Sequence, residues 1–126
     1  MEFEIDIQDV KEVYQDLLQG FINRLNLYKY NTDGLNISLT WFMVFRKLTQ
    51  AQKLWWHLKT FKSITSAGAE DIYHFRHPPS IIRDIRKKLI QEGADYQISN
   101  VEKEGIDWWG NTCKYDEYTL KEISNP

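Results

Sequence analysis

The dipeptide Pro78-Pro79 constrains the fold of this chain more than any other feature of the sequence. Two consecutive prolines cannot lie inside a helix, because proline lacks an amide proton and its ring clashes with the preceding turn. Pro79 can nevertheless occupy the first position of a helix, where proline is favoured. We therefore predict a turn over residues 74–79 and a helix over Ser80–Glu92, with Gly93 as its C-terminal stop.

Hydrophobic periodicity predicts two more helices before this turn and two strands after it. The first helix begins at Thr49, a favourable N-cap residue, and the second, ending near Tyr73, can be capped by Thr65 or Ser66. The apolar stripe of the first helix consists of Ala51, Leu54, Trp55 and Leu58. Residues 96–102 and 113–120 are predicted to be the strands of a long hairpin. From residue 49 onward, the order is three helices followed by two strands.

Residues 1–47 are expected to form a strand, a helix and a second strand. Alternating apolar residues predict the strands, the first at Phe3, Ile5 and Ile7 and the second over 35–45. The run 41–45 is apolar on both parities and would also suit a buried helix. The helix over 9–30 carries a seam with 4-3-4-3 spacing, formed by Tyr14, Leu18, Phe21, Leu25 and Tyr28. Such a seam either packs within its own domain or pairs with a second copy as a homodimer contact.

The charge of the chain is strongly segregated. The net charge is −2, but residues 1–20 carry −5, residues 21–93 carry +7 and residues 94–126 carry −4. Because the middle segment is basic, the slightly negative overall charge does not exclude a nucleic acid as the partner.

The basic residues concentrate on the predicted helix over 80–92. Four apolar residues share its buried face: Ile81, Ile82, Ile85 and Leu89. Ser80, Arg83 and Lys87 fall on the opposite face, flanked by Arg86 and Ile90. Arginine can bond guanine with two hydrogen bonds, and lysine and serine can contact phosphates or base edges. The candidate residues for DNA recognition are Ser80, Arg83, Arg86 and Lys87. The candidates for contacts with the phosphate backbone of the DNA are Arg76, Lys88, Lys103 and Lys114. The alternative is an ordinary solvated basic helix.

Three stretches carry a resemblance to a known family: Ser63-Ile64-Thr65-Ser66, residues 82–87 and residues 110–120. In this order, residues 48–120 resemble the winged helix-turn-helix domains often found in phage and prophage proteins. The resemblance implies an α+β protein with an N-terminal extension over 1–47, a winged helix-turn-helix domain over 48–122 and a tail over 123–126. It also implies a phage or mobile-element transcriptional regulator or accessory factor. Its third helix would enter the major groove of double-stranded DNA, and its wing would touch the backbone.

This sequence differs from the family in three respects. The third helix is about one turn longer, and Ile81 stands where family members commonly have an arginine. The wing over 102–112, usually basic, is acidic here, which would repel phosphate. We expect one of Trp108 and Trp109 at the wing tip to be buried and the other exposed.

The acidic wing leaves a second functional class open. In it, the chain is a protein-binding winged helix of a phage that inhibits a host nucleic-acid enzyme or a defence complex, in the manner of an anti-CRISPR protein. The wing and the N-terminal arm would make the contacts. Partner-binding candidates are Trp108, Trp109, Tyr14, Leu18, Phe21 and Leu25.

The remaining chemistry-bearing residues do not indicate an enzyme. His74 and His77 lie beside an arginine and could be joined only by Cys113, so neither a metal site nor a cofactor is expected. The single cysteine excludes a disulfide scaffold. The acidic N-terminus differs from a signal peptide, and no apolar run approaches the ~20 residues of a membrane span. A cytoplasmic protein is therefore expected.

Overall fold

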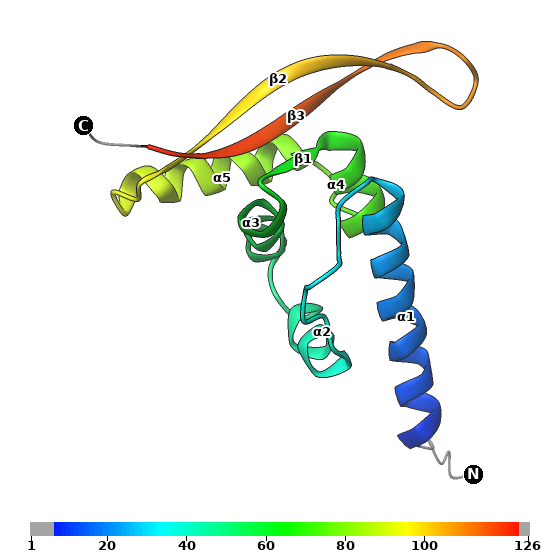
Figure 1. Cartoon of the computed structure of the whole chain (residues 1–126). Coiled ribbons are helices and arrows are strands. Elements are labelled where there is room, and N and C mark those ends of the chain that lie inside the picture. Colours follow the sequence, from blue (N-terminus) through cyan, green and yellow to red (C-terminus); the bar gives the residue numbers. More distant parts are fainter. Residues whose placement is uncertain (1–6, 124–126) are drawn as a thin grey trace. The chain divides into compact units, whose positions relative to one another are not determined.

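The computed structural model describes residues 7–123 and shows an α+β protein (Figure 1). Within that range there are five helices and three strands. In chain order they are α1 (Ile7–Leu27), α2 (Leu39–Phe45), α3 (Gln50–Phe61), β1 (Ser63–Thr65), α4 (Ser66–Tyr73), α5 (Pro78–Gln91), β2 (Tyr96–Ile106) and β3 (Thr112–Glu122). The chain separates into two compact units at the boundary between Leu48 and Thr49. Among the described helices, none has an apolar stretch long enough to span a bilayer.

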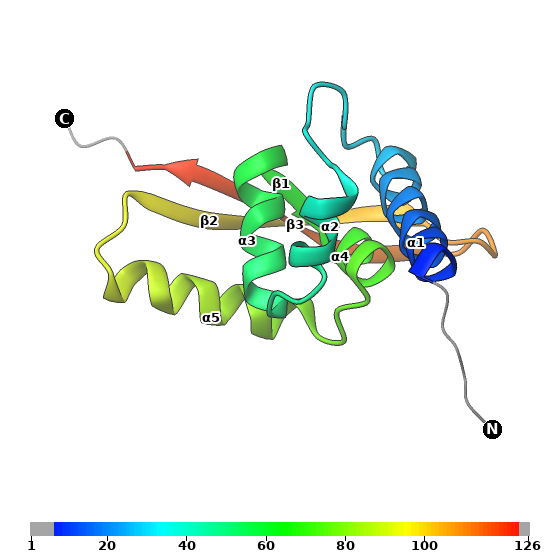
Figure 2. The same ribbon diagram turned by 90° about the horizontal axis from the view of Figure 1, so that it is seen from below.

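The second unit is built on an antiparallel sheet in the order β1-β3-β2. β2 and β3 form the predicted hairpin, longer than expected, with Ile106 opposite Thr112 at its end. The short β1 pairs with the other edge of β3, placing Ile64 opposite Tyr118. Helices α3, α4 and α5 cover one face of the sheet, and the far end of the hairpin extends beyond them (Figures 1 and 2).

The core of this unit lies between the three helices and the sheet. The predicted buried stripe of α5 is confirmed, since Ile81, Ile82, Ile85 and Leu89 are all buried. They pack against buried side chains from α3, β1, α4, the turn after α4, β2 and β3, among them Leu54, Leu58, Ile64, Ala69, Phe75, Ile98, Tyr118 and Leu120. A continuous apolar stripe of this kind fixes which side of α5 faces the solvent.

The predicted starts of α3 and α4 are also confirmed. The hydroxyl of Thr49 accepts from the amide of Gln52, and the Gln52 side chain accepts from the Thr49 amide, which is a capping box. Thr65 caps α4 by accepting from the amide of Gly68 at 3.0 Å. The predicted break at 63–66 contains β1, a strand of three residues that is too short to show alternation.

The first unit corrects one prediction. Residues 35–45 do not form a strand, because Leu39–Phe45 is the helix α2. The hydroxyl of Ser38 accepts from the amide of Trp41 and caps this helix. The run that is apolar on both parities turns both Phe42 and Phe45 inward, against the ring of Phe21 on α1 at 6.0 and 5.6 Å. The alternation of apolar and polar residues that predicted a strand ends at Thr40. Beyond that residue, the clustered aromatic rings stabilise a helix.

The helix predicted over 9–30 is confirmed as α1. The strand predicted around Phe3, Ile5 and Ile7 lies mostly outside the described residues, and Ile7 itself begins α1.

Candidate nucleic-acid interface

The helix α5 owes its start to the residues around the two prolines. Pro78 and Pro79 occupy its first two positions, so the helix begins two residues earlier than predicted. The ring of His77 accepts from the amide of Ser80 and also contacts the Ser80 hydroxyl, so His77 is the N-cap. At the other end, Gly93 adopts φ +63°, which glycine reaches without strain, and ends the helix as predicted.

The solvent face of α5 is basic. Arg83, Lys87 and Lys88 are exposed, as is Arg76 in the turn before the helix. Within residues 7–123, none of these four cations takes part in an ion pair. The helix carries four bases and one acid, the exposed Asp84, which gives it a net charge of +3. Ser80 is half-buried and is held at the N-terminus of the helix by His77.

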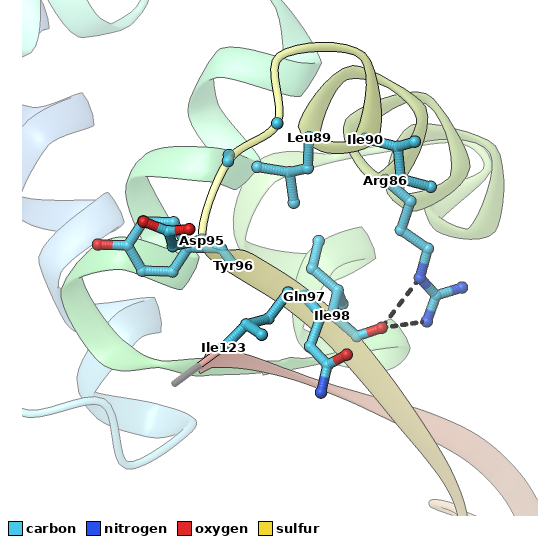
Figure 3. Close-up of a pocket in the computed structure, with 10 residues that line it drawn as sticks. Arg86, Leu89, Ile90, Asp95, Tyr96, Gln97, Ile98 and Ile123 are labelled. Carbon is cyan, nitrogen blue, oxygen red and sulfur yellow. Dashed lines mark hydrogen bonds between the residues drawn. The ribbon is translucent and has the colours of Figure 1, made fainter. Parts of the chain in front are cut away.

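Arg86 differs from the other predicted DNA-binding cations because it bonds the sheet. Its Nε and one terminal nitrogen donate to the carbonyl of Ile98 at 3.0 and 2.8 Å (Figure 3). That terminal nitrogen also donates to Asn100 Oδ1 at 3.1 Å. This guanidinium lies near Tyr118, where it opposes the rise in the tyrosine pKa that burial and Asp116 cause. Arg86 therefore joins α5 to β2.

The two hairpin lysines are engaged across the strands. Lys103 Nζ lies 3.2 Å from a carboxylate oxygen of Glu117, and Lys114 Nζ lies 3.4 Å from one of Glu102. Exposed pairs of this kind contribute little stability, but each neutralises a cation that was predicted to contact DNA. The hairpin around them is acidic, with five acids and two bases over residues 102–117.

The tip of the hairpin corrects a second prediction. We expected one of Trp108 and Trp109 to be buried, but the exposed fractions of their side chains are 100% and 88%. The tip extends beyond the helices of its unit (Figures 1 and 2), and both rings lie in solvent.

The predicted seam of α1 is covered mainly from within the chain. Phe21 and Leu25 are buried, whereas Tyr14 and Leu18 are half-buried. Phe21 packs on the aromatic rings of α2, and the guanidinium carbon of Arg46 lies 4.7 Å from the ring centre of Tyr14. These contacts occupy much of the face that a second copy would need.

Sequence reasoning missed one buried polar residue, His57. Its side chain is fully buried on α3, and its ring bonds the Tyr73 hydroxyl at 2.6 Å and the Ser63 carbonyl at 3.0 Å. Burial lowers the pKa of His57 to about 3, so the ring is neutral at neutral pH. The position of His57 beside the apolar stripe at Leu54 and Leu58 is the feature of the sequence that could have predicted its burial. Among the described residues there is no cluster of histidine, cysteine and carboxylate side chains that could hold a metal ion.

Two open pockets flank the C-terminal half of α5. One, of about 470 Å³, is lined by residues of α5, the following turn and β2, including Leu89, Tyr96 and Ile98 (Figure 3). The other, of about 430 Å³, lies between α3, α5 and Tyr96 and includes Trp55. Both are mainly apolar and neither contains converging charged groups of one sign, so neither identifies a ligand.

Comparisons with known proteins do not identify a family or a function for this chain. The chain matches no protein-family model, no curated protein and no solved structure.

Proposed function

We propose that residues 49–122 form a winged helix-turn-helix domain that binds double-stranded DNA through α5. The order α3-β1-α4-α5-β2-β3, with the sheet order β1-β3-β2, is compatible with that fold. In such a domain α4, the turn at 74–77 and α5 are the helix-turn-helix, and α5 enters the major groove. The hairpin of β2 and β3 is the wing.

The observation that carries the proposal is the unpaired basic face of α5. Arg83 and Lys87 are one turn apart on the exposed side of a helix whose opposite side is buried. Side chains at this spacing are neighbours, about 5–6 Å apart at Cβ. Arg83 can therefore reach a guanine edge while Lys87 contacts a phosphate, and Arg76 and Lys88 add two more cations for the backbone.

The hairpin does not contribute to DNA binding in this proposal. Lys103 and Lys114 are each paired with a glutamate, and the surrounding carboxylates repel phosphate. Binding then depends on at most four cations of α5 and the turn before it. Since each neutralised phosphate contributes about 0.9 to the slope of log K against log salt, the slope should be no steeper than about −3.6.

The resemblance of the sequence extends the proposal to a biological role. The chain would act as a transcriptional regulator or accessory DNA-binding factor of a phage or mobile element. Its affinity for random duplex should fall in the micromolar range that non-specific electrostatic binding produces.

The test is the salt dependence of DNA binding by a double variant. Arg83→Ala with Lys87→Ala should weaken the binding of a labelled random duplex and flatten the slope by about 1.8. The matched control, Lys11→Ala with Lys121→Ala, removes the same charge from exposed sites outside α5 and should leave the slope unchanged. Equal slopes for the two variants, measured by fluorescence anisotropy, would refute the proposal.

A further inference from the structure

The turn at the tip of the hairpin is held by its own hydrogen bonds. Asp107 Oδ1 accepts from the amides of Trp109 and Asn111, both at 2.9 Å. The amide of Asp107 donates to the carbonyl of Asn111 at 2.9 Å, and the amide of Gly110 donates to the carbonyl of Asp107 at 3.1 Å. Gly110 adopts φ +81°, which favours glycine. The backbone that carries Trp108 and Trp109 is therefore an ordered turn.

This ordered turn presents a large apolar surface to solvent. Trp108 and Trp109 are almost fully exposed, and Ile106 beside them has an exposed fraction of 78%. Two tryptophan rings can bury roughly 400 Å² against a partner, about half of what one side of a standard protein interface buries. Tryptophan is also among the residues that dominate binding energy at interfaces.

The charge around the tip indicates the chemistry of that partner. Glu102 and Glu104 are exposed on the same hairpin and Asp107 is half-buried in its turn. The hairpin carries a net charge of −3 over residues 102–117. The hairpin lysines are neutralised by Glu102 and Glu117. A surface with this charge repels the phosphates of DNA, RNA and anionic lipid, and attracts a surface rich in lysine and arginine.

We infer that the hairpin tip is a docking site for a protein that offers an apolar pocket bordered by basic residues. Trp108 and Trp109 enter the pocket, and the surrounding carboxylates face its basic border. The turn holds the two rings in place before binding, which limits the ordering that binding requires. This inference is independent of DNA binding by α5, because it uses residues of the hairpin alone.

The test begins with photo-cross-linking of the full chain. Trp109 is replaced by p-benzoylphenylalanine, an aromatic side chain that preserves the apolar tip, and the protein is irradiated in an extract of its native cells. The matched control carries the same replacement at Glu122, an exposed position at the other end of the hairpin. We expect a protein that is labelled from position 109 and not from position 122.

The labelled protein is then purified and titrated against the chain by calorimetry. Trp108→Ala with Trp109→Ala should raise its Kd by at least about thirtyfold, the loss expected for interface anchors. Glu102→Gln with Glu104→Gln should slow association at low salt. The control Ile90→Ala, an exposed apolar residue on α5, should leave Kd unchanged.

Several outcomes would overturn the inference. They are cross-links to nucleic acid, a covalent dimer of the chain itself, equal labelling from positions 109 and 122, and no protein product. A captured protein that binds the double tryptophan variant as tightly as the original chain would overturn it as well. Because both rings are exposed, the variants should unfold at the same urea concentration as the original chain, which circular dichroism checks.

Discussion

Replacing Arg86 with methionine should destabilise the second unit without touching the proposed DNA surface. The amide of Leu120, which lies opposite Ile98, donates to Lys62 on the other side of β3. Ile98 and Leu120 are therefore a non-hydrogen-bonded pair, and the carbonyl of Ile98 faces away from β3. Arg86 is the group that satisfies this edge carbonyl, with two N–H donors at 3.0 and 2.8 Å.

The expected loss follows from these contacts. A hydrogen bond from a charged group contributes about 1.5–3 kcal/mol. Arg86 is half-buried, so we expect Arg86→Met to lower the free energy of unfolding by roughly 2 kcal/mol and Tm by about 10 °C. Methionine keeps the apolar stem of the side chain, so the loss reports mainly the guanidinium.

The assay is urea unfolding followed by circular dichroism, with Lys87→Met as the matched control. Lys87 is exposed and unpaired among the described residues, so this variant should stay within about 0.5 kcal/mol of the original chain. Equal stability of the two variants would refute the role assigned to Arg86. The salt slope of DNA binding should change in Lys87→Met and not in Arg86→Met.

Two further predictions concern His57 and Ser38. Burial lowers the pKa of His57 to about 3, whereas the unfolded chain binds this proton below about pH 6.5; its contribution to stability is therefore complete above pH 6.5 and is lost as the pH falls toward 3. The free energy of unfolding, measured by urea titration between about pH 4 and 7, should fall with decreasing pH more steeply in the original chain than in His57→Gln, by up to about 1.4 kcal/mol per pH unit; parallel curves would contradict this. Ser38→Ala should lower the stability of α2 by about 1 kcal/mol, whereas Ser38→Asp should keep it, because aspartate is also a good N-cap. Unchanged rates of amide hydrogen exchange at Phe42 and Phe45 in Ser38→Ala would contradict the role of Ser38 as the cap.

The part of the fold that sequence predicted is the part governed by local chemistry. Pro78-Pro79 and Gly93 determine where α5 begins and ends, Thr49 caps α3, and the isoleucine stripe of α5 is buried. Each of these depends on backbone conformation or on a period that a single element carries by itself.

The parts that sequence missed depend on contacts between elements. Residues 41–45 are apolar at every position, so their period could not distinguish a strand from a helix; the rings of Phe42 and Phe45 against Phe21 favour the helix. The side chain of Arg86 flanks the basic face on a helical projection, and only the exposed edge of β2 explains why it bonds Ile98. The burial of one of the two tip tryptophans was predicted without knowing how far the hairpin extends.

Backbone amide NMR during titration with duplex DNA tests the proposed interface most directly. At about 50 mM salt, we predict shifts concentrated at residues 80–88 of α5 and at Arg76, with residues 102–112 of the hairpin unchanged. Shifts confined to the hairpin, or no shifts at protein and DNA concentrations where non-specific binding occurs, would contradict DNA binding by α5.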